Sequence, residues 1–340
     1  MTDLSLFSPK RILVCQLRQI GDVLLATPSI RLLKQRYPAA DIDVLTEKKC
    51  STVLHNNPNI DRIWTIDKKK LKNPLKALKF YAKVGRSDYD LIVDFQQLPR
   101  CKWVIRFSSA PVKLTHTPPW YNRFLYTHWI QREGGYAAKC KASTLAPLGI
   151  EWHSEKPELY LSEDERLWAQ NYVSELNVHG MRLVTLDPSH RRETRRWPKS
   201  YFAKLMQELS KHCPDVSFIL TYGPGELEIA NEVNLLAGKL AIIPDRVLTL
   251  REMAAIQELS ALHIGNCSAP RHFAVAVNTP SITIQGATSR AWRYPSDDHV
   301  SVAKDLECQF CNSNTCSTRE CLTTLTPDEV LHEAIKLLEK

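Results

Sequence analysis

An apolar strand, a polar loop and an amphipathic helix follow one another without a break in residues 11–28, RILVCQLRQIGDVLLATP. Residues 12–15 are apolar, and apolar residues then recur at helical spacing from Val23 to Leu33. A unit of this kind is typical of the start of an α/β domain with a parallel sheet. The loop contains neither GxGxxG nor GxxxxGK[ST], so the two common nucleotide-binding fingerprints are excluded for this loop.

Asp22 lies at the end of this loop, at the start of the predicted helix. A short carboxylate there can cap free backbone N–H groups. The same position is the carboxyl end of the first strand, where open α/β sheets bind ligands. Taken alone, the stretch favours the capping role, with Gly21 allowing a tight turn.

Length and composition limit the class of protein. A chain of 340 residues with 44% hydrophobic residues predicts about two globular domains. No apolar run reaches the roughly 18 residues of a membrane-spanning helix, and the N-terminus shows no signal peptide, so we expect a cytoplasmic protein. The cytosol would keep the ten cysteines reduced. The net charge of +8 favours an anionic partner such as a nucleic acid, a phosphorylated lipid or a nucleotide.

The α/β pattern continues through the first half of the chain and begins again after a crossover near residues 156–161. The patterns predict strands at 42–45, 59–66, 91–95, 183–186, 216–221, 241–243, 262–265 and 281–284. They predict helices at 51–56, 67–84, 198–212, 226–237, 250–259, 270–277 and 327–338, and another helix that begins after the capping box at Ser162. We therefore expect two α/β domains with a cleft at the carboxyl ends of their strands.

Two segments of the first half carry many cations. Residues 67–84 form a lysine-rich amphipathic stretch, which suits either a solvated helix packed on a sheet or a basic helix resting on anionic lipid headgroups. Residues 99–141 mix tryptophan, tyrosine and phenylalanine with arginine and lysine. This mixture suits sugar or phosphate recognition, and it equally suits a loop-rich edge packed on the core.

Three loops follow strands in the second half. Residues 187–198, DPSHRRETRRWP, are rich in arginine and precede a helix that we expect to begin at Pro198. Guanidinium groups beside a helix N-terminus can bind a diphosphate, although a solvated loop containing Glu193 is the alternative. Residues 265–272 combine small residues with a helix start, which suits backbone N–H contacts with an anion. Residues 285–288 form the third loop.

Together these stretches resemble the ADP-heptose:lipopolysaccharide heptosyltransferase family, glycosyltransferase family 9. The resemblance lies in GDVLLATP, RRWP, GNCSAPRHFAVAVNTPSITIQGAT and a cysteine-rich segment before TPDEV, in this order over nearly the whole chain. It implies the GT-B fold, an α/β architecture of two Rossmann-like domains facing across a cleft. It also implies an acceptor-binding domain at residues 1–156, a nucleotide-sugar-binding domain at 157–325 and a C-terminal helix at 326–340.

The resemblance also implies a reaction. Members of the family transfer heptose from ADP-L-glycero-D-manno-heptose to the inner core of lipopolysaccharide, with inversion at the anomeric carbon and without a cofactor. The implied acceptor is Kdo-lipid A or a heptosylated core, and the implied location is the cytoplasmic face of the inner membrane, with peripheral membrane contact. No nucleic-acid recognition motif is present. The alternatives are a degenerate homologue that binds a nucleotide or lipid A without transfer, and a member that uses a different donor sugar.

Site residues follow from the resemblance position by position. Asp22 matches the family's general base. Arg195 stands where many members have lysine, and Glu226 is near an acidic position that contacts the ribose or base. Relatives typically have G-x-D-[ST]-G where this chain has Cys267 in place of Asp and Ala269 in place of Gly. The implied donor-binding residues are Arg195, Arg196, Glu226, Cys267, Ser268, Ala269 and His272, and the implied acceptor-binding residues are Arg18, Gln19, Arg100 and Arg123.

Four cysteines close to the C-terminus follow the spacing C-x2-C-x4-C-x4-C. Four thiolates this close in sequence can bind a tetrahedral Zn²⁺ ion. The alternative is a set of thiols in a surface loop, and the resembled family, which also has cysteines here, is not generally regarded as a zinc family. The residues of this zinc hypothesis are Cys308, Cys311, Cys316 and Cys321.

Overall fold

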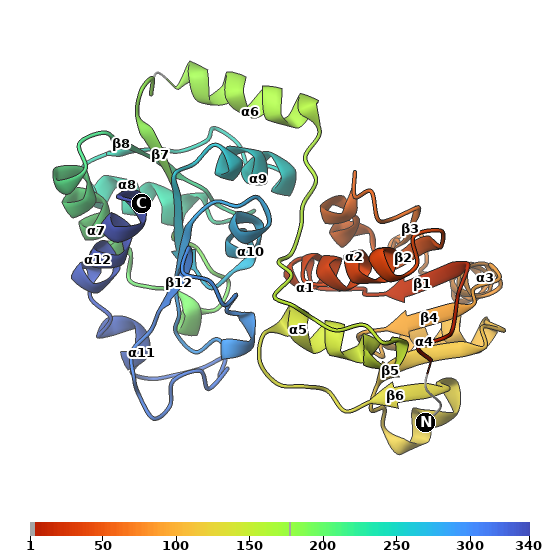
Figure 1. Cartoon of the computed structure of the whole chain (residues 1–340). Helices are drawn as coiled ribbons and strands as arrows, with labels where there is room; N and C mark the ends of the chain where they lie inside the picture. The colour runs from red at the N-terminus through yellow and green to blue at the C-terminus, as the bar shows by residue number, and fades with distance from the viewer. Residues whose placement is uncertain (1–3, 177) are drawn as a thin grey trace. The chain divides into compact units, whose positions relative to one another are not determined.

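The structure, a computed structural model, describes residues 4–176 and 178–340. The chain divides into two compact units, Met1–Tyr160 and Leu161–Lys340. The sequence predicts a boundary after residue 156, four residues before this division. Each unit contains its own six-stranded sheet, which confirms the predicted α/β class with two Rossmann-like halves (Figure 1). Within the described residues, no helix combines the length and apolar character needed to cross a membrane.

The sheet of the first unit has the order β3-β2-β1-β4-β5-β6, and all of its strand pairs are parallel. Its central strands β1 and β4 are apolar and buried because helices cover both faces of a parallel sheet. The strands are β1 (Arg11–Cys15), β2 (Asp41–Glu47), β3 (Arg62–Ile66), β4 (Leu91–Asp94), β5 (Val112–His116) and β6 (His128–Ile130).

Helices of the first unit differ from the predicted ones in two places. The helix predicted over residues 67–84 begins only at Pro74, because the side chain of Asn73 accepts hydrogen bonds from the N–H groups of Leu75 and Lys76 and caps it. The helix predicted over 51–56 is the 3₁₀ helix η1 (Lys48–Leu54). The other elements are α1 (Ile20–Leu24), α2 (Thr27–Arg36), α3 (Pro74–Gly85), α4 (Pro99–Phe107), η2 (Trp120–Leu125), α5 (Ala137–Ala142) and η3 (Ser143–Leu148).

The sheet of the second unit has the order β12-β11-β10-β7-β8-β9 and is also parallel throughout. Its edge strand β12 was not predicted, since it is only four residues long and all of its residues are only half-buried. The strands are β7 (Arg182–Asp187), β8 (Val216–Leu220), β9 (Ala241–Ile242), β10 (Leu262–Asn266), β11 (Ser281–Ile284) and β12 (His299–Val302).

Two helices of the second unit begin where their caps predict. Ser162 and Glu165 form a capping box at α6, and Thr326 caps α12. Helix α7 begins one residue later than expected because Pro198 has extended backbone and is the N-cap residue. The helices are α6 (Glu163–Glu175), α7 (Lys199–His212), α8 (Leu227–Leu236), α9 (Leu250–Glu258), α10 (Ala269–Ala276), α11 (Glu320–Thr323) and α12 (Pro327–Leu338), with the 3₁₀ helices η4 (Glu193–Arg195) and η5 (Arg290–Trp292).

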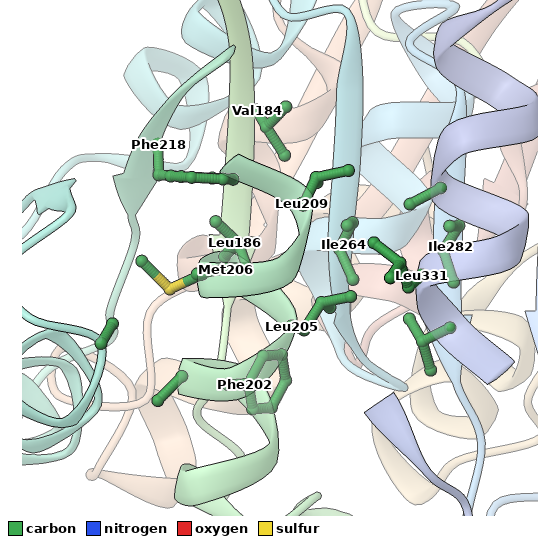
Figure 2. Close-up of a cluster of buried hydrophobic side chains, with 14 of the residues drawn as sticks. Val184, Leu186, Phe202, Leu205, Met206, Leu209, Phe218, Ile264, Ile282 and Leu331 are labelled. Atoms are coloured by element: carbon green, nitrogen blue, oxygen red, sulfur yellow. The ribbon is translucent and has the colours of Figure 1, made fainter. Parts of the chain in front are cut away.

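A large apolar core lies between one face of this second sheet and helices α7 and α12. One cluster contains Phe202, Leu205 and Leu209 of α7, Ile264 of β10 and Leu331 of α12 (Figure 2). Burial of each such side chain stabilises the fold by about 1.5–3 kcal/mol. The core therefore fixes the strand ends from which the loops of the candidate site emerge.

Candidate functional site

Asp22 lies at the carboxyl end of β1, on the short helix α1. The helix already begins at Ile20, so Asp22 is its third residue and not the residue at its start. Its Oδ2 atom accepts a hydrogen bond from the backbone N–H of Gln19 at 3.2 Å. The side chain remains 23% exposed. Asp22 therefore caps the helix and still presents part of its carboxylate to solvent.

Lys141 of α5 is the partner of Asp22 that sequence reasoning missed. Its Nζ atom lies 3.3 Å from Oδ1 of Asp22, and its side chain is only 7% exposed. Burial lowers the pKa of Lys141, and the Asp22 carboxylate opposes this shift. A lysine between the small residues Cys140 and Ala142 was the only signal in the sequence, and it is a weak one.

The loop before Asp22 is supported from the neighbouring strand β4. Oε1 of Gln96 accepts hydrogen bonds from the backbone N–H groups of Leu17 and Arg18, at 3.0 and 3.1 Å. The N–H of Gln96 donates to Asp94, which is fully buried and also accepts from the hydroxyl of Tyr126. Burial raises the pKa of Asp94. The end of β4 therefore fixes the backbone that leads to Asp22.

Three cations surround a buried carboxylate at the end of β2. Glu47 is 2% exposed and forms ion pairs with Lys68 at 2.8 Å, Arg100 at 3.0 Å and Lys49 at 3.9 Å. We call these four residues the Glu47 cluster. Lys49 also donates to the side chain of Gln19 at 3.2 Å, which links the cluster to α1. One carboxylate cannot neutralise three cations, so the cluster is positively charged.

The four implied acceptor residues do not gather in one place. Arg100 belongs to the Glu47 cluster, and Gln19 accepts a hydrogen bond from Lys49 of that cluster. Arg18 directly precedes Gln19 in the loop after β1. Arg123 lies instead on η2, before the edge strand β6, with its guanidinium 5.8 Å from the centre of the Trp129 ring. The sequence could not separate Arg123 from the others because strand order decides which loops are neighbours.

In the second unit, a tryptophan connects the arginine-rich loop to the loop after β10. Trp197 is fully buried, its backbone N–H donates to Oδ1 of Asn266 at 2.9 Å, and its indole N–H donates to the carbonyl of Leu325. Nδ2 of Asn266 in turn donates to the carbonyl of Pro188. The two loops that the sequence predicted as anion-binding are therefore held side by side at the carboxyl ends of β7 and β10.

The two arginines implied in donor binding have different surroundings. Arg196 donates twice to the backbone carbonyl of His190, at 3.0 and 2.6 Å. Arg195 donates to Oδ1 of Asn312, and its Nε atom is buried without a hydrogen-bond partner among the described residues. Burial and the nearby guanidinium of Arg192 lower the pKa of Arg195. An anion at Arg195 would relieve both the missing hydrogen bond and the repulsion.

A carboxylate network lies beside these loops. Asp187, at the end of β7, accepts hydrogen bonds from the hydroxyls of Ser268 at 2.5 Å and Ser189 at 2.9 Å. The Ser189 hydroxyl also lies 2.6 Å from Oε2 of Glu226. Burial, and less strongly the nearby Glu226, raises the pKa of Asp187 to about 6. The structure thus places Glu226 and Ser268 in one network, around an aspartate that was not predicted as a site residue.

Cys267 pairs with a buried arginine. Its Sγ atom accepts a hydrogen bond from Nη1 of Arg271 at 3.2 Å, and the exposed fractions are 6% for Cys267 and 3% for Arg271. Ala269 is the first residue of α10. His272, on the same helix, is buried, and its ring packs edge-to-face with the Trp292 ring, with the ring centres 6.0 Å apart. Arg271 is thus a further cation at this loop, and no sequence signal distinguished it.

Hydrogen bonds hold the segment before α11 against the loops that follow β7 and β11. The side chain of Gln309 donates to the carbonyls of Gln285 and Gly286, and the hydroxyl of Thr194 donates to the carbonyl of Ser313. Gly286 is needed here, because a Cβ atom would lie 2.8 Å from the carbonyl oxygen of Thr194 and 2.9 Å from Leu322. This close approach brings Asn312 to Arg195.

The zinc hypothesis gains no support from the geometry of these cysteines. In the part of the chain that the structure describes, no three His, Cys, Asp or Glu side chains are grouped to hold a metal ion. Cys308, Cys311 and Cys316 are exposed, and Sγ of Cys316 accepts a hydrogen bond from the backbone N–H of Arg319. Burial, and less strongly the nearby thiols of Cys308, Cys316 and Cys311, raises the pKa of Cys321 to about 11.

Comparisons with known proteins point to one family. The family model described as Glycosyltransferase family 9 (heptosyltransferase) matches residues 77–322. The chain is 33% identical to lipopolysaccharide heptosyltransferase 3 of Escherichia coli over 301 residues, covering 82% of this chain and 85% of that protein. A glycosyltransferase family 9 structure from Veillonella parvula matches with a TM-score of 0.86 at 22% identity, covering 97% of both chains. E. coli heptosyltransferase WaaC with ADP-2-deoxy-2-fluoro heptose matches with a TM-score of 0.73 at 16% identity, covering 96% of this chain and 99% of that one. These two structural matches concern the fold.

Proposed function

We propose, from the premise that the chain belongs to glycosyltransferase family 9 (heptosyltransferase), that it transfers heptose from ADP-L-glycero-D-manno-heptose to the inner core of lipopolysaccharide. Membership makes the protein a glycosyltransferase with the GT-B fold, and its relatives make it a heptosyltransferase of lipopolysaccharide core synthesis. The donor is inferred from E. coli WaaC, whose structure holds the analogue ADP-2-deoxy-2-fluoro heptose. We assign acceptor binding to Met1–Tyr160 and donor binding to Leu161–Lys340.

The observation that carries the mechanism is the partly exposed carboxylate of Asp22 at the carboxyl end of β1, paired with a buried lysine. In the proposed step an acceptor hydroxyl oxygen attacks C1 of the heptose from the face opposite the diphosphate. The bond from C1 to the diphosphate oxygen breaks, and the hydroxyl proton passes to Asp22, the general base. The anomeric configuration inverts because attack and departure occur on opposite faces.

As the C1–O bond breaks, negative charge develops on the phosphate oxygens of ADP. Its departure requires cations or N–H donors beside these oxygens. Arg195 fits this role because its Nε atom has no partner among the described residues and its loop is anchored by Trp197. Arg196 acts indirectly, since its two hydrogen bonds to His190 shape the loop. Backbone N–H groups at the start of α10 add further donors for the diphosphate.

The acceptor is an anionic sugar-lipid, and the Glu47 cluster suits its carboxylate and phosphate groups. Lys49, Lys68 and Arg100 are each 37–53% exposed, so their charges can reach a ligand while Glu47 orients them. We assign acceptor binding to this cluster together with Arg18 and Gln19. Arg123 lies on η2 and is not part of this cluster.

A degenerate homologue remains the second candidate because a thiol, Cys267, stands in place of the family's aspartate. Two contacts favour the active enzyme. The hydroxyl of Ser268 donates a hydrogen bond to Asp187, so the loop after β10 still contacts a carboxylate although it lacks the family's own aspartate. The sulfur of Cys267 faces the guanidinium of Arg271, so the site keeps a cation. Both contacts lie beside the arginine-rich loop.

A transfer assay tests the proposal. Purified protein is mixed with ADP-heptose and a panel of truncated core lipids, and ADP release and product mass are followed together. We expect heptose addition to one truncation, and a loss of about 10²–10⁴-fold in kcat for Asp22→Asn with donor binding retained. Asp41→Asn, an exposed carboxylate at the amino end of β2, is the matched control. Donor binding without product on any acceptor would support the degenerate homologue.

A further inference from the structure

Positive charge is concentrated in two segments of the first unit. Residues 68–87 and 95–132 hold 14 of the 45 lysines and arginines and none of the 37 aspartates and glutamates. The rest of the chain, with 31 basic and 37 acidic residues, is therefore net negative. The charge of +8 is a property of these segments and not of the whole surface.

These segments fold next to one another. Helix α3 packs against α4, and α4 packs against η2. The guanidinium of Arg86, at the end of α3, lies 5.9 Å from the ring centre of Phe107 at the end of α4. Buried residues of all three elements, including Val84, Val104 and Leu125, share one core cluster. The three elements therefore form one continuous layer on the sheet.

This layer carries the exposed aromatic side chains of the described chain. Trp120 is 80% exposed, Phe124 71%, Tyr121 57% and Trp103 43%, and every other described aromatic residue is less exposed. Leu75, on α3, is 70% exposed. Single exposed apolar residues are ordinary, but clustered aromatic ones mark an interaction surface.

Three lysines on α3 or just before it remain available for a partner. Among the described residues, Lys72, Lys76 and Lys79 are exposed and form no ion pair with an acidic side chain. This separates them from Lys68, which is paired with Glu47. Arg106 on α4 and Arg123 on η2 are also exposed and place cations beside the aromatic residues.

We propose that Trp103, Trp120, Tyr121 and Phe124, together with Lys72, Lys76 and Lys79, form a surface that docks on an anionic lipid bilayer. Tryptophan and tyrosine favour the headgroup region of a membrane, and lysine and arginine are attracted to anionic lipids. The core of a protein interface is depleted of charge, whereas here cations stand beside the aromatics. The role of this surface rests on the proposed function, in which the acceptor is a membrane lipid.

Vesicle sedimentation of the full chain tests the surface without donor or acceptor. We expect binding to phosphatidylcholine vesicles that contain phosphatidylglycerol and much weaker binding to phosphatidylcholine alone. The double variant Trp120→Ala/Phe124→Ala should lower the partition coefficient at least ten-fold. Lys76→Gln/Lys79→Gln should lower it about five-fold for each charge removed, on the anionic vesicles only.

The matched control is Leu235→Ala/Leu236→Ala, which removes apolar residues of α8 that are 67% and 52% exposed. It should leave vesicle binding unchanged. All variants alter exposed residues, so their thermal midpoints should equal that of the wild type. As a second readout, brominated lipids should quench the protein's fluorescence less in Trp120→Phe. Unchanged binding in both surface variants, or an equal loss in the control, would overturn the proposal.

A soluble acceptor separates this proposal from the proposed function. The surface variants should keep the wild-type rate on a de-acylated core oligosaccharide and lose rate on acceptor in vesicles. Vesicle binding without transfer to either acceptor would refute the heptosyltransferase reaction and leave the surface standing. Transfer to both acceptors by a protein that does not bind acceptor-free anionic vesicles would refute the surface alone.

Discussion

The ammonium group of Lys141 lies 3.3 Å from the carboxylate of Asp22, across 119 positions of sequence. Lys141 is buried, and a buried ammonium is costly unless a carboxylate pairs with it. The same pair holds Oδ1 of Asp22 in a defined position, as the proposed base requires. With Gln19 on the other oxygen, the carboxylate is held on both sides.

Lys141→Met should lower kcat by about ten-fold or more and leave the KM for ADP-heptose nearly unchanged, because the lysine positions the base and does not touch the donor. Steady-state kinetics with ADP-heptose and acceptor measure kcat and KM separately.

Two variants control this experiment. Lys141→Arg keeps the charge and should restore much of the rate. Lys139→Met removes a lysine from the same helix that is 45% exposed and paired with Glu133, and it should change nothing. Equal losses of activity in Lys141→Met and Lys141→Arg, with a lowered thermal midpoint in both, would indicate only structural damage.

Arg195→Ala should lower kcat/KM for ADP-heptose by about ten- to hundred-fold, the usual loss for a hydrogen bond to a charged group. Its buried Nε atom, without a partner among the described residues, is the reason for choosing it over Arg196. Arg195→Lys should recover only part of the loss, since lysine lacks the planar fork. Arg191→Ala, an exposed arginine of the same loop, is the control. Equal losses in both alanine variants would contradict a specific role for Arg195.

Asp187 should make the stability of the folded state pH-dependent. Its pKa is raised to about 6, so the folded protein keeps this proton at pH values where the unfolded chain has lost it. The stability from this group is fully present below about pH 4, the pKa of an unfolded aspartate, and is lost as the pH rises through about 6.

Asp187→Asn removes this titration. The free energy of unfolding of the variant, minus that of the wild type, should rise by up to about 3 kcal/mol between about pH 4 and about pH 7. Denaturant unfolding at several pH values measures it. Using the difference cancels the opposite effect of His190 and His263, whose pKa values burial lowers to about 4 and about 3. A difference that stays constant with pH would show that Asp187 ionises normally.

Gly286→Ala should destabilise the second unit by about 1–3 kcal/mol, because the new methyl group overlaps the Thr194 carbonyl and Leu322. The strain should also move the Arg195 loop and raise the KM for the donor. Gly134→Ala is the matched control, since no atom lies within 4 Å of its Cβ position. Thermal unfolding and donor kinetics of both variants measure the effect, and equal stability of the two variants would contradict the packing constraint.

The sequence determined the features that depend on near neighbours. Alternating and helical periodicities predicted most strands and helices, and the capping residues Ser162 and Thr326 marked two helix starts correctly, because caps are contacts between residues three apart. The motif GDVLLATP identified Asp22 and contributed to the family resemblance. Strand β12 and the true start of α3 were missed, since their signals are a half-buried edge and a single asparagine cap.

Only the tertiary structure decided which distant residues meet. Lys141 contacts Asp22 and Asp187 contacts Ser268 because the strand order and the packing of α5 bring separate loops together. Arg123 on η2 lies over the Trp129 ring, whereas Arg100 on α4 pairs with Glu47. Periodicity reports which side of an element is buried, and it contains no information about which partner buries it. Charge pairing and desolvation depend on that partner, so they follow from the fold and not from the local sequence.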